Sequence, residues 1–295
     1  MALTITASFQ KFKENLQITG LQESAISTRQ DNIRDAMSKE LEVKSSFLTG
    51  SYRRDTMIAP LSKADIDIFV VLDPKYFARY NQGLNGGQAG LLDLVKAALK
   101  RTYPKTPDVS RNGQAVTVQF TDFVVDVVPG FERQGGGYLI PDSIRKNWIS
   151  TNPKTHIELV KTANTFQNGN FVPIIKMIKA WNRNTGKFFS SFHLEMLALR
   201  VFEGVRISDF PSGMRYFFDK GRQYMDKQLA DPAGYGGDVS MYINTQEKID
   251  EAVNKFQLAY ERAVKAESAA QRSNVSEAVE FWIKIFGDYY FPTYG

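Results

Sequence analysis

The chain has 295 residues, 43% of them hydrophobic, and no cysteine, which excludes disulfides, thiol catalysis and cysteine-ligated zinc. No segment approaches the roughly 20 apolar residues of a membrane span. Residues 1–4 do not begin a secretory signal, so we expect a cytoplasmic protein without a membrane partner. The net charge of +5 is small and spread along the chain, which indicates a solvated basic surface rather than a nucleic-acid track.

The predicted elements form a sheet-bearing part followed by a helical part. Apolar residues at helical spacing over 5–42 predict one or two opening helices that lie along both parts. We then expect strands near 44–49 and 66–72, a helix near 89–101, strands near 107–111, 114–120 and 122–128, and helices near 154–166, 171–185, 190–203, 208–228, 245–268 and 274–287. The sequence therefore predicts an α+β fold, with a mixed sheet over residues 1–150 and a helical domain over residues 151–295.

Two aspartates, Asp65 and Asp67, lie within the apolar run of residues 64–72. Because side chains alternate along a strand, both carboxylates point to one face, and Ile66 and Ile68 point to the other. A strand this apolar belongs in the middle of a sheet, where two adjacent ionised carboxylates repel each other and are costly to desolvate. The structural alternative is that the pair lies on the solvated face of an edge strand.

A third carboxylate, Asp126, lies in the β-branched run of residues 123–128. Mg²⁺ takes oxygen ligands from one or two carboxylates together with substrate phosphates. Three carboxylates on neighbouring strands can hold two ions about 3.5–4 Å apart, the arrangement that supports in-line phosphoryl displacement. We therefore expect Asp65, Asp67 and Asp126 to be catalytic and to bind two Mg²⁺ ions, for which Mn²⁺ can substitute.

A Gly-Ser pair precedes these strands. Residues 46–49 predict a short strand, and Gly50 and Ser51 a tight turn that opens a short helix through residue 57. Glycine lets the backbone approach closely, and N–H groups at a helix start bind phosphate oxygens. Gly-Ser alone is a very weak signal. Its position before the Asp-x-Asp strand and the later Asp strand favours a triphosphate cradle over the structural alternative.

In this order the motifs resemble the polymerase-β-like nucleotidyltransferase superfamily, whose pattern is Gly-Ser, Asp-x-Asp and a third Asp. Within it the chain is most similar to the bacterial cGAS/DncV-like nucleotidyltransferases, which are cyclic oligonucleotide synthases of anti-phage signalling. The segments that carry the resemblance are 48–56, 65–67, 125–129, 137–142, 148–153, 179–182, 191–195 and 282–287. The resemblance implies a polymerase-β-like core with a mixed sheet and a C-terminal helical domain similar to that of oligoadenylate synthases.

The resemblance also implies nucleotide-binding residues in the helical part. In the family, a lysine just before a Trp and a serine just before an aromatic residue and Leu-Glu reach the donor triphosphate. Those positions are Lys179 and Ser191 here, and Phe192, where the family more often has tyrosine, is expected to stack on a base. Lys176 and Ser190 are competing positions, because the spacing between the two motifs varies in the family.

Other residues have weaker functional interpretations. Tyr138 follows a glycine-rich loop and is expected to stack on the acceptor base, with a partly buried surface tyrosine as the equal alternative. His193 is expected to be a core histidine, and two histidines without metal-ligand spacing do not favour zinc. We therefore expect no zinc-dependent DNA sensing of the kind found in the animal relative. Residues 231–245 are expected to form a long loop, to which we assign no chemistry.

The expected function is metal-dependent joining of NTPs, ATP among them, into a cyclic di- or trinucleotide second messenger, with release of pyrophosphate. The product would reach a downstream effector, and the sequence leaves a regulatory protein open as a further partner. Alternatives are a linear oligonucleotide synthase and an enzyme that adds nucleotides to RNA, a small molecule or a protein. A third alternative is a non-enzymatic binding protein that keeps the fold as a scaffold. The intact set of three aspartates argues against it.

Overall fold

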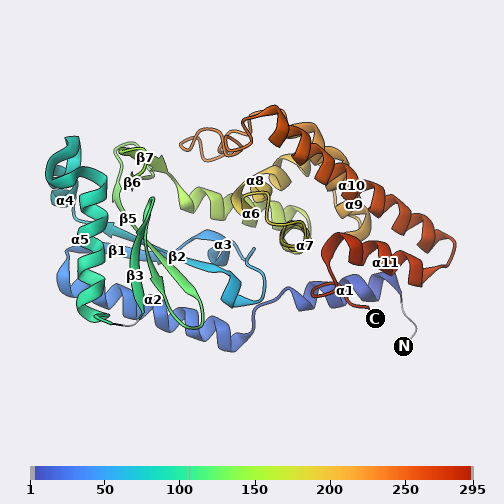
Figure 1. Ribbon diagram of the computed structural model, residues 1–295, viewed down its shortest axis with the longest axis horizontal. Helices are drawn as coiled ribbons and strands as arrows, with labels where there is room; N and C mark the ends of the chain where they lie inside the picture. The colour runs from blue at the N-terminus through green and yellow to red at the C-terminus, as the bar shows by residue number, and fades with distance from the viewer. Residues whose placement is uncertain (1–3, 106, 294–295) are drawn as a thin grey trace. The chain divides into compact units, whose positions relative to one another are not determined.

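The computed structural model of the chain describes residues 4–105 and 107–293. The chain divides into two compact units, which we call the sheet unit, residues 18–157, and the helical unit, residues 1–17 together with 158–295. Figure 1 colours both by position in the chain. The predicted α+β class is confirmed. The predicted division at residue 150 concerns the functional parts of the chain and stays a prediction. None of the described helices is both long enough and apolar enough to cross a bilayer.

Within the described residues, seven strands form a mixed sheet, in the order β1-β2-β5-β4-β3, with β6 paired to β5 and β7 to β6. The strands are β1 Val43–Leu48, β2 Asp65–Leu72, β3 Asp108–Asn112, β4 Ala115–Gln119, β5 Val124–Glu132, β6 Tyr138–Asp142 and β7 Asn147–Thr151. β2 and β5 are parallel, and the other pairs are antiparallel. β2 therefore lies inside the sheet, between β1 and β5, as its apolar sequence predicts.

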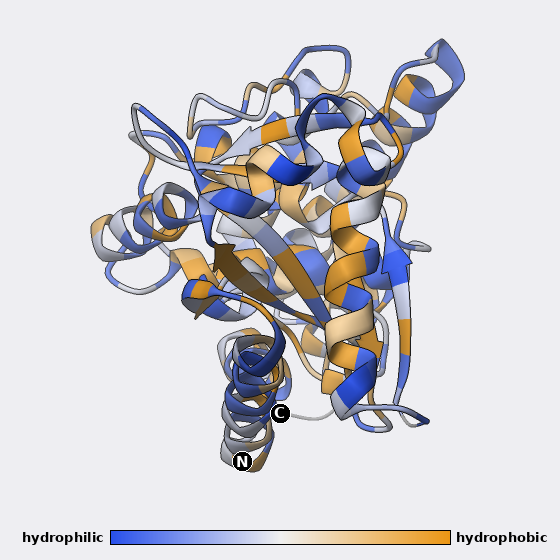
Figure 2. Ribbon diagram, turned by 90° about the vertical axis from the view of Figure 1, so that its left-hand side faces the viewer, coloured by the Kyte–Doolittle hydropathy of each residue, from blue (hydrophilic) through white to orange (hydrophobic). Residues whose placement is uncertain are grey.

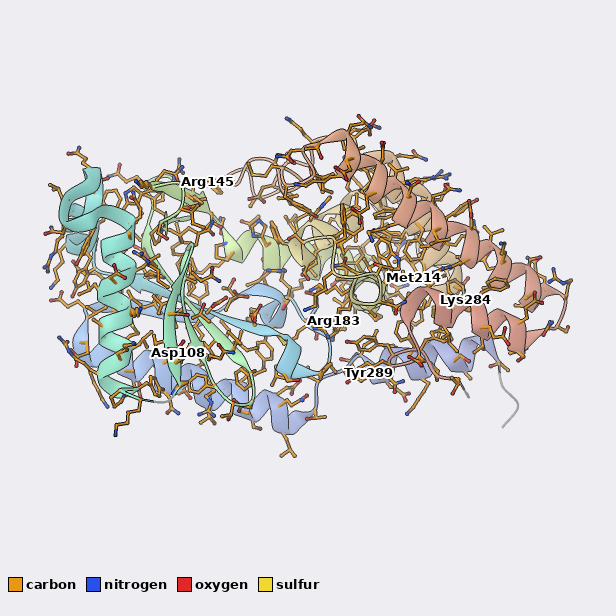
Figure 3. All side chains as sticks on the ribbon, viewed as in Figure 1. Asp108, Arg145, Arg183, Met214, Lys284 and Tyr289 are labelled. Atoms are coloured by element: carbon orange, nitrogen blue, oxygen red, sulfur yellow. The ribbon has the colours of Figure 1, made fainter. Side chains whose placement is uncertain are left out.

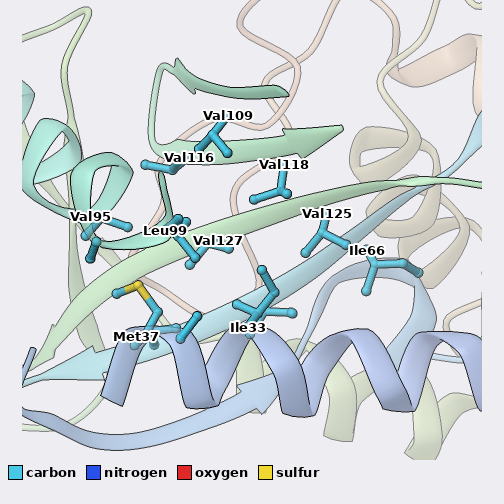
Figure 4. Packing of buried hydrophobic residues seen from close by; sticks show 14 of the residues in the cluster. Ile33, Met37, Ile66, Val95, Leu99, Val109, Val116, Val118, Val125 and Val127 are labelled. Carbon is cyan, nitrogen blue, oxygen red and sulfur yellow. The ribbon is translucent and has the colours of Figure 1, made fainter. Parts of the chain in front are cut away.

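Helices α2 (Gly20–Glu40) and α5 (Gly87–Thr102) cover one face of the sheet. Figure 4 shows Ile33 and Met37 of α2 pointing at the strands, and buried Val125 and Ile66 belong to the same hydrophobic cluster. Hydrophobic and hydrophilic residues alternate around the helices of this unit in Figure 2, as expected for helices that bury one stripe. Since Ile66 faces this cluster, the residues next to it in β2 point to the opposite face.

Three elements of the sheet unit escaped prediction. Helix α4 (Pro74–Tyr80) is short and begins at a proline, with the Asp73 side chain accepting a hydrogen bond from the Lys75 N–H. Strands β6 and β7 form a hairpin of five-residue strands, and Pro141 within β6 weakens its strand signal. Residues 81–86, for which we expect neither a helix nor a strand, form a 3-10 segment that contains left-handed residues.

The helical unit consists of seven α-helices among the described residues, and it includes the greater part of α6. They are α1 Ile5–Asn15, α6 Pro153–Phe166, α7 Phe171–Asn184, α8 Ser191–Val201, α9 Phe210–Gly221, α10 Gln246–Gln271 and α11 Val275–Phe286. The predicted helix over 208–228 is shorter, because α9 passes into a 3-10 turn at Arg222–Tyr224. Figure 3 labels Arg183, whose guanidinium donates a hydrogen bond to the Tyr290 hydroxyl at 2.7 Å.

Aromatic side chains fill the core of the helical unit. Phe9 of α1 lies edge-on to Trp282 of α11, with ring centroids 4.9 Å apart. Trp181 of α7 packs against Phe218 at 5.1 Å and Phe256 at 4.9 Å. Aromatic pairs of this kind contribute about 0.5–1.5 kcal/mol beyond the area they bury. They hold α7, the helix that carries the two predicted nucleotide-binding lysines, in a rigid setting.

Candidate functional site

The three predicted catalytic aspartates lie on one face of two adjacent strands. In the parallel pairing of β2 and β5, Asp67 lies opposite Asp126, and Asp65 lies opposite Val124. All three side chains point away from the face that α2 and α5 cover, because Ile66 and Val125, one position along, are buried in that cluster. The sheet therefore places the three carboxylates on the face opposite α2 and α5, as the alternation predicted.

Gly50 lies directly against Asp67. Its backbone is left-handed, with φ of 63°, and a Cβ added there would stand 2.6 Å from Cγ of Asp67 and closer still to Oδ2. The Thr49 N–H donates a hydrogen bond to the Asp67 carbonyl at 2.9 Å, which fixes the turn against β2. Only glycine allows both the conformation and the approach. The turn and the carboxylate are thus one packed unit.

The helix that follows, α3 (Gly50–Arg53), ends earlier than the predicted residue 57. Asp55 adopts a left-handed φ of 57°, which ends a helix in the way a C-terminal cap does. The backbone then turns back, and the N–H groups of Thr56 and Met57 donate to the Ser51 carbonyl at 2.9 and 3.2 Å. Ser51 is half-buried, and its carbonyl holds this turn in place.

The carboxyl group of Asp126 has a raised pKa. Burial raises the pKa of its carboxyl above the ordinary value, a hydrogen bond from the Thr117 hydroxyl opposes this, and the charge of Asp65 raises the pKa further. The Thr117 Oγ1 donates to Asp126 Oδ1 at 2.6 Å from the neighbouring strand β4. Two carboxylates that feel each other's charge in a half-buried setting favour the binding of a cation or a proton.

The carboxylates fit a divalent metal by donor type and position. They offer hard oxygen ligands from neighbouring strands, and burial, together with the charge of Asp65, raises the pKa of Asp126, so a cation beside it would offset an unfavourable charge. Among the described residues, no three His, Cys, Asp or Glu side chains are already gathered as metal ligands. Thr117 donates to Oδ1 of Asp126, and the second carboxylate oxygen, Oδ2, can still serve as a metal ligand. The residue set therefore suits Mg²⁺.

Tyr138 is buried rather than exposed. Its ring has 7% of its surface accessible and packs against Phe69, with centroids 4.9 Å apart, on the face of the sheet that carries the aspartates. The ring centroid of Phe47 lies 5.8 Å from that of Tyr138, and the Lys154 ammonium lies 5.5 Å from the Tyr138 ring centroid. These contacts leave little of the ring for a ligand, and they favour the partly buried tyrosine over the base-stacking interpretation.

The two predicted lysines of α7 are both buried and both have partners. Lys179 Nζ lies 2.7 Å from Glu195 Oε1 of α8, with side chains 6% and 0% exposed. Lys176 Nζ donates to the Gln17 side-chain oxygen at 2.8 Å. A buried ammonium needs a counterion, and Glu195 supplies it for Lys179. Lys179 is thus held by a charged residue of α8, four positions after Ser191.

Ser191 and Phe192 form the first turn of α8. Ser190 is the N-cap residue but its side chain does not cap the helix, and Ser191 is exposed while Phe192 is half-buried. The N-terminus of a helix carries a partial positive charge that favours anions. The ion pair of Lys179 with Glu195 joins α7 to α8, the helix that begins at Ser191, and the contact of Lys179 and Ser191 with a phosphate stays a prediction.

Sequence reasoning missed three residues that shape these groups. Thr117 is recognisable only from the register that pairs β4 with β5. Glu195 lies in segment 191–195, one of those that carry the resemblance. Its charge within an otherwise apolar helix was the signal that it needs a buried partner. Tyr242 reaches α8 from the loop before α10, and no sequence signal indicates that contact.

Comparisons with known proteins identify a family and relatives. The model of the second messenger oligonucleotide or dinucleotide synthetase domain matches residues 3–164, more than half of the chain. Over 283 residues the chain is 27% identical to the cyclic AMP-AMP-AMP synthase of an Acinetobacter species, strain ATCC 27244 / 9458, a match that covers 89% of this chain and 78% of that protein.

Solved structures show the same fold. The structure of Escherichia coli MS115-1 CdnC with ATP superposes with a TM-score of 0.76 at 19% identity, covering 97% of this chain and 98% of that one. The complex of the same CdnC with an N-terminally truncated HORMA protein gives a TM-score of 0.75 at 18% identity, covering 96% and 97% of the two chains. At these identities the likeness shows the fold alone.

Proposed function

The chain belongs to the second messenger oligonucleotide or dinucleotide synthetase family, and on this premise we propose that it joins NTPs into a cyclic di- or trinucleotide and releases pyrophosphate. It is a nucleotidyltransferase of the cyclic oligonucleotide synthase family, to which CdnC also belongs. The observation that carries the proposal is the placement of Asp67 opposite Asp126 on parallel strands, with Gly50 packed against the Asp67 carboxylate.

In the proposed reaction the carboxylates of Asp65 and Asp67 would hold the metal that accompanies the donor triphosphate, and Asp126 would complete the site for the acceptor hydroxyl. Two Mg²⁺ ions would supply charge neutralisation at the α-phosphate and a lowered pKa of the attacking hydroxyl. The oxygen of that hydroxyl forms a bond to the α-phosphorus as the bond to the pyrophosphate oxygen breaks. A linear intermediate then repeats the step on itself, which closes the ring.

The backbone around Gly50 and Ser51 is proposed to approach the donor phosphates. The close packing against Asp67 places the turn and the metal-binding carboxylate within one contact of each other. A glycine in this conformation exposes its N–H and leaves no side chain in the way of a phosphate oxygen. Holding the donor phosphates in the geometry for in-line attack can lower the activation barrier by several kcal/mol.

Lys179, Ser191 and Phe192 are proposed to bind the donor nucleotide in the helical unit, with Lys176 as the competing lysine. Glu195 Oε1 lies 2.7 Å from Lys179 Nζ, which holds the Lys179 side chain against α8, the helix that carries Ser191 and Phe192. The Lys176 ammonium donates a hydrogen bond to the Gln17 side-chain oxygen. A phosphate that meets Lys179 would share its ammonium with Glu195, since an ammonium donates three hydrogen bonds.

A cyclic product and ATP as a substrate are supported by the relatives. The Acinetobacter relative is a cyclic AMP-AMP-AMP synthase, and CdnC has been solved with ATP. CdnC has also been solved with a HORMA protein, which supports a regulatory protein as a partner of this chain. The product would act on a downstream effector in anti-phage defence. Base identity and ring size follow from the pocket that binds the acceptor.

A direct test is release of pyrophosphate from the four NTPs with Mg²⁺ by the Asp67→Asn variant. Asp108→Asn is its matched control, because Asp108 is an exposed aspartate at the start of β3, labelled in Figure 3. We expect Asp67→Asn to lose activity by at least about 1,000-fold, since metal binding depends on the carboxylate charge, and Asp108→Asn to match the wild type. Equal activity of Asp67→Asn and wild type would contradict the proposed site.

A further inference from the structure

A tyrosine from the loop before α10 contacts the start of α8. The Tyr242 hydroxyl accepts a hydrogen bond from the Ser190 N–H at 2.9 Å and lies 2.7 Å from Nδ1 of His193. Both partners flank Ser191 and Phe192, the residues of α8 proposed to bind nucleotide. One side chain thus holds the N-cap residue and the third residue of the helix together.

The Tyr242 hydroxyl joins two groups of α8. Burial raises the pKa of Tyr242 to about 12 and lowers that of His193 to about 4, so both groups are neutral at physiological pH. The Tyr242 oxygen accepts from the Ser190 N–H, and a second hydrogen bond joins the hydroxyl to Nδ1 of the neutral imidazole, in the direction that the His193 tautomer sets. The Ser190 N–H, the Tyr242 hydroxyl and the imidazole thus form one continuous chain of hydrogen bonds.

This arrangement has a cost that packing alone does not explain. His193 is 1% exposed, and among the described residues its Nε2 has no hydrogen-bond partner. A buried donor or acceptor without a partner costs roughly 1–3 kcal/mol. An apolar residue at this position would avoid that cost, since Phe189 already packs edge-on to the ring at 6.2 Å. A buried polar group kept at such a cost is accounted for by a specific role.

The loop that presents Tyr242 is itself held in shape. The Asp238 carboxylate accepts hydrogen bonds from the N–H groups of Leu229 and Ser240, at 3.0 and 2.9 Å, and from the Ser240 hydroxyl at 2.6 Å. At the other end, the Lys248 ammonium donates to the Tyr242 carbonyl at 2.9 Å. The loop is thus an ordered element that delivers one hydroxyl to α8, rather than a flexible connection.

We propose that Tyr242 is a positioning residue for nucleotide binding: through Ser190 and His193 it fixes the first turn of α8. Ser191 and Phe192 are then presented to the donor nucleotide in one geometry. This inference rests on the proposed function, because it gives the first turn of α8 a nucleotide to bind. It assigns the loop of residues 231–245 a role in affinity for the NTP.

The test compares Tyr242→Phe with Tyr289→Phe. Both changes remove one phenolic hydroxyl, and Tyr289 is a matched control because its side chain is 66% exposed. Calorimetry with Mg²⁺ and an ATP analogue, in which a methylene group replaces the α,β-bridging oxygen, gives Kd without turnover. Steady-state kinetics with ATP then separate KM from kcat, and melting temperatures report folding.

We expect Tyr242→Phe to weaken analogue binding by about tenfold, equivalent to about 1.4 kcal/mol, and to raise KM more than it lowers kcat. His193→Phe is expected to do the same. The double variant should lose no more affinity than either single variant, because both act through one hydrogen-bonded unit. Tyr289→Phe should bind the analogue as the wild type does.

A lower melting temperature of Tyr242→Phe with unchanged Kd and KM would mean that Tyr242 only stabilises the fold, and would overturn the inference. Additive losses in the double variant would overturn the route through His193. If wild-type protein bound neither the analogue nor ATP, the proposed function itself would fail. Tight binding by the wild type that Tyr242→Phe leaves unchanged would instead refute only the role of Tyr242.

Discussion

Replacing Gly50 by alanine tests the packing of the Gly-Ser turn on the metal-binding carboxylate. The added methyl group would stand 2.6 Å from Cγ of Asp67, whereas carbon atoms in contact lie about 3.5–4.0 Å apart. The Asp67 carboxylate or the turn must therefore move by roughly 1 Å. Alanine in the left-handed region, at φ of 63°, adds a backbone cost of about 1–2 kcal/mol.

The backbone cost can be separated from the displacement by a second glycine in the same unit. Gly83 is also left-handed, with φ of 78°, but a Cβ there meets nothing within 4 Å. Gly83→Ala should therefore lower stability by a similar 1–2 kcal/mol without touching the site. Gly50→Ala should lower stability by at least as much and also displace the carboxylate.

The assay is kcat/KM for pyrophosphate release from ATP with Mg²⁺, measured well below the melting temperature of each variant. A 1 Å misplacement of a catalytic group can cost about 100-fold in rate, so we expect that loss for Gly50→Ala. Gly83→Ala should remain within about twofold of the wild type because its site is intact. Wild-type activity of Gly50→Ala, or equal losses in both variants, would refute the reasoning.

Two further predictions concern stability. Burial raises the native pKa of Asp126, so its contribution favours folding below the unfolded pKa and is lost as the pH rises through the native pKa. Asp126→Asn should therefore raise the melting temperature at neutral pH without divalent metal, by an amount that shrinks as the pH falls through that native value. Glu195→Gln leaves Lys179 buried without its counterion and should destabilise the protein by about 3–5 kcal/mol, measured by denaturant unfolding.

Each has a control in the chain. Asp108→Asn should leave the melting temperature unchanged across the same pH range, and an equal rise in both aspartate variants would contradict a specific effect of burial. Glu203→Gln breaks the ion pair with Arg200, whose side chains are 56% and 70% exposed, and should cost far less than Glu195→Gln. Similar losses in the two glutamate variants would show that burial of the Lys179 pair carries no special weight.

The faces of β2 were predictable because alternation depends only on sequence. Ile66 and Ile68 are buried under α2 and α5, and Asp65 and Asp67 point the other way. The pairing of Asp67 with Asp126 depends on the register between strands nearly 60 positions apart, which local pattern does not fix. The sequence indicated that position 50 requires glycine. It did not indicate that the neighbouring group is the Asp67 carboxylate.

Long-range side-chain pairs were the features that the sequence could not supply. Lys179 was identified by its neighbours in the chain, whereas its counterion Glu195 comes from the next helix. Tyr138 was expected either to stack on a base or to be a partly buried tyrosine, and its packing on Phe69 favours the second, because the glycine-rich loop before it does not specify which strand it joins. Tyr242 reaches α8 across 49 residues of chain. Such contacts follow from packing of whole helices and loops, which local periodicity does not specify.

We propose above all that the enzyme synthesises a cyclic oligonucleotide with the aspartates of β2 and β5 as its catalytic residues. The most direct test of this claim is mass spectrometry of phosphatase-treated products after incubation with all four NTPs and Mg²⁺ or Mn²⁺, for wild type, Asp67→Asn and Asp108→Asn. We predict a phosphatase-resistant cyclic di- or trinucleotide from the wild type and Asp108→Asn, and none from Asp67→Asn. Products that phosphatase degrades completely, or a cyclic product from Asp67→Asn, would contradict the claim.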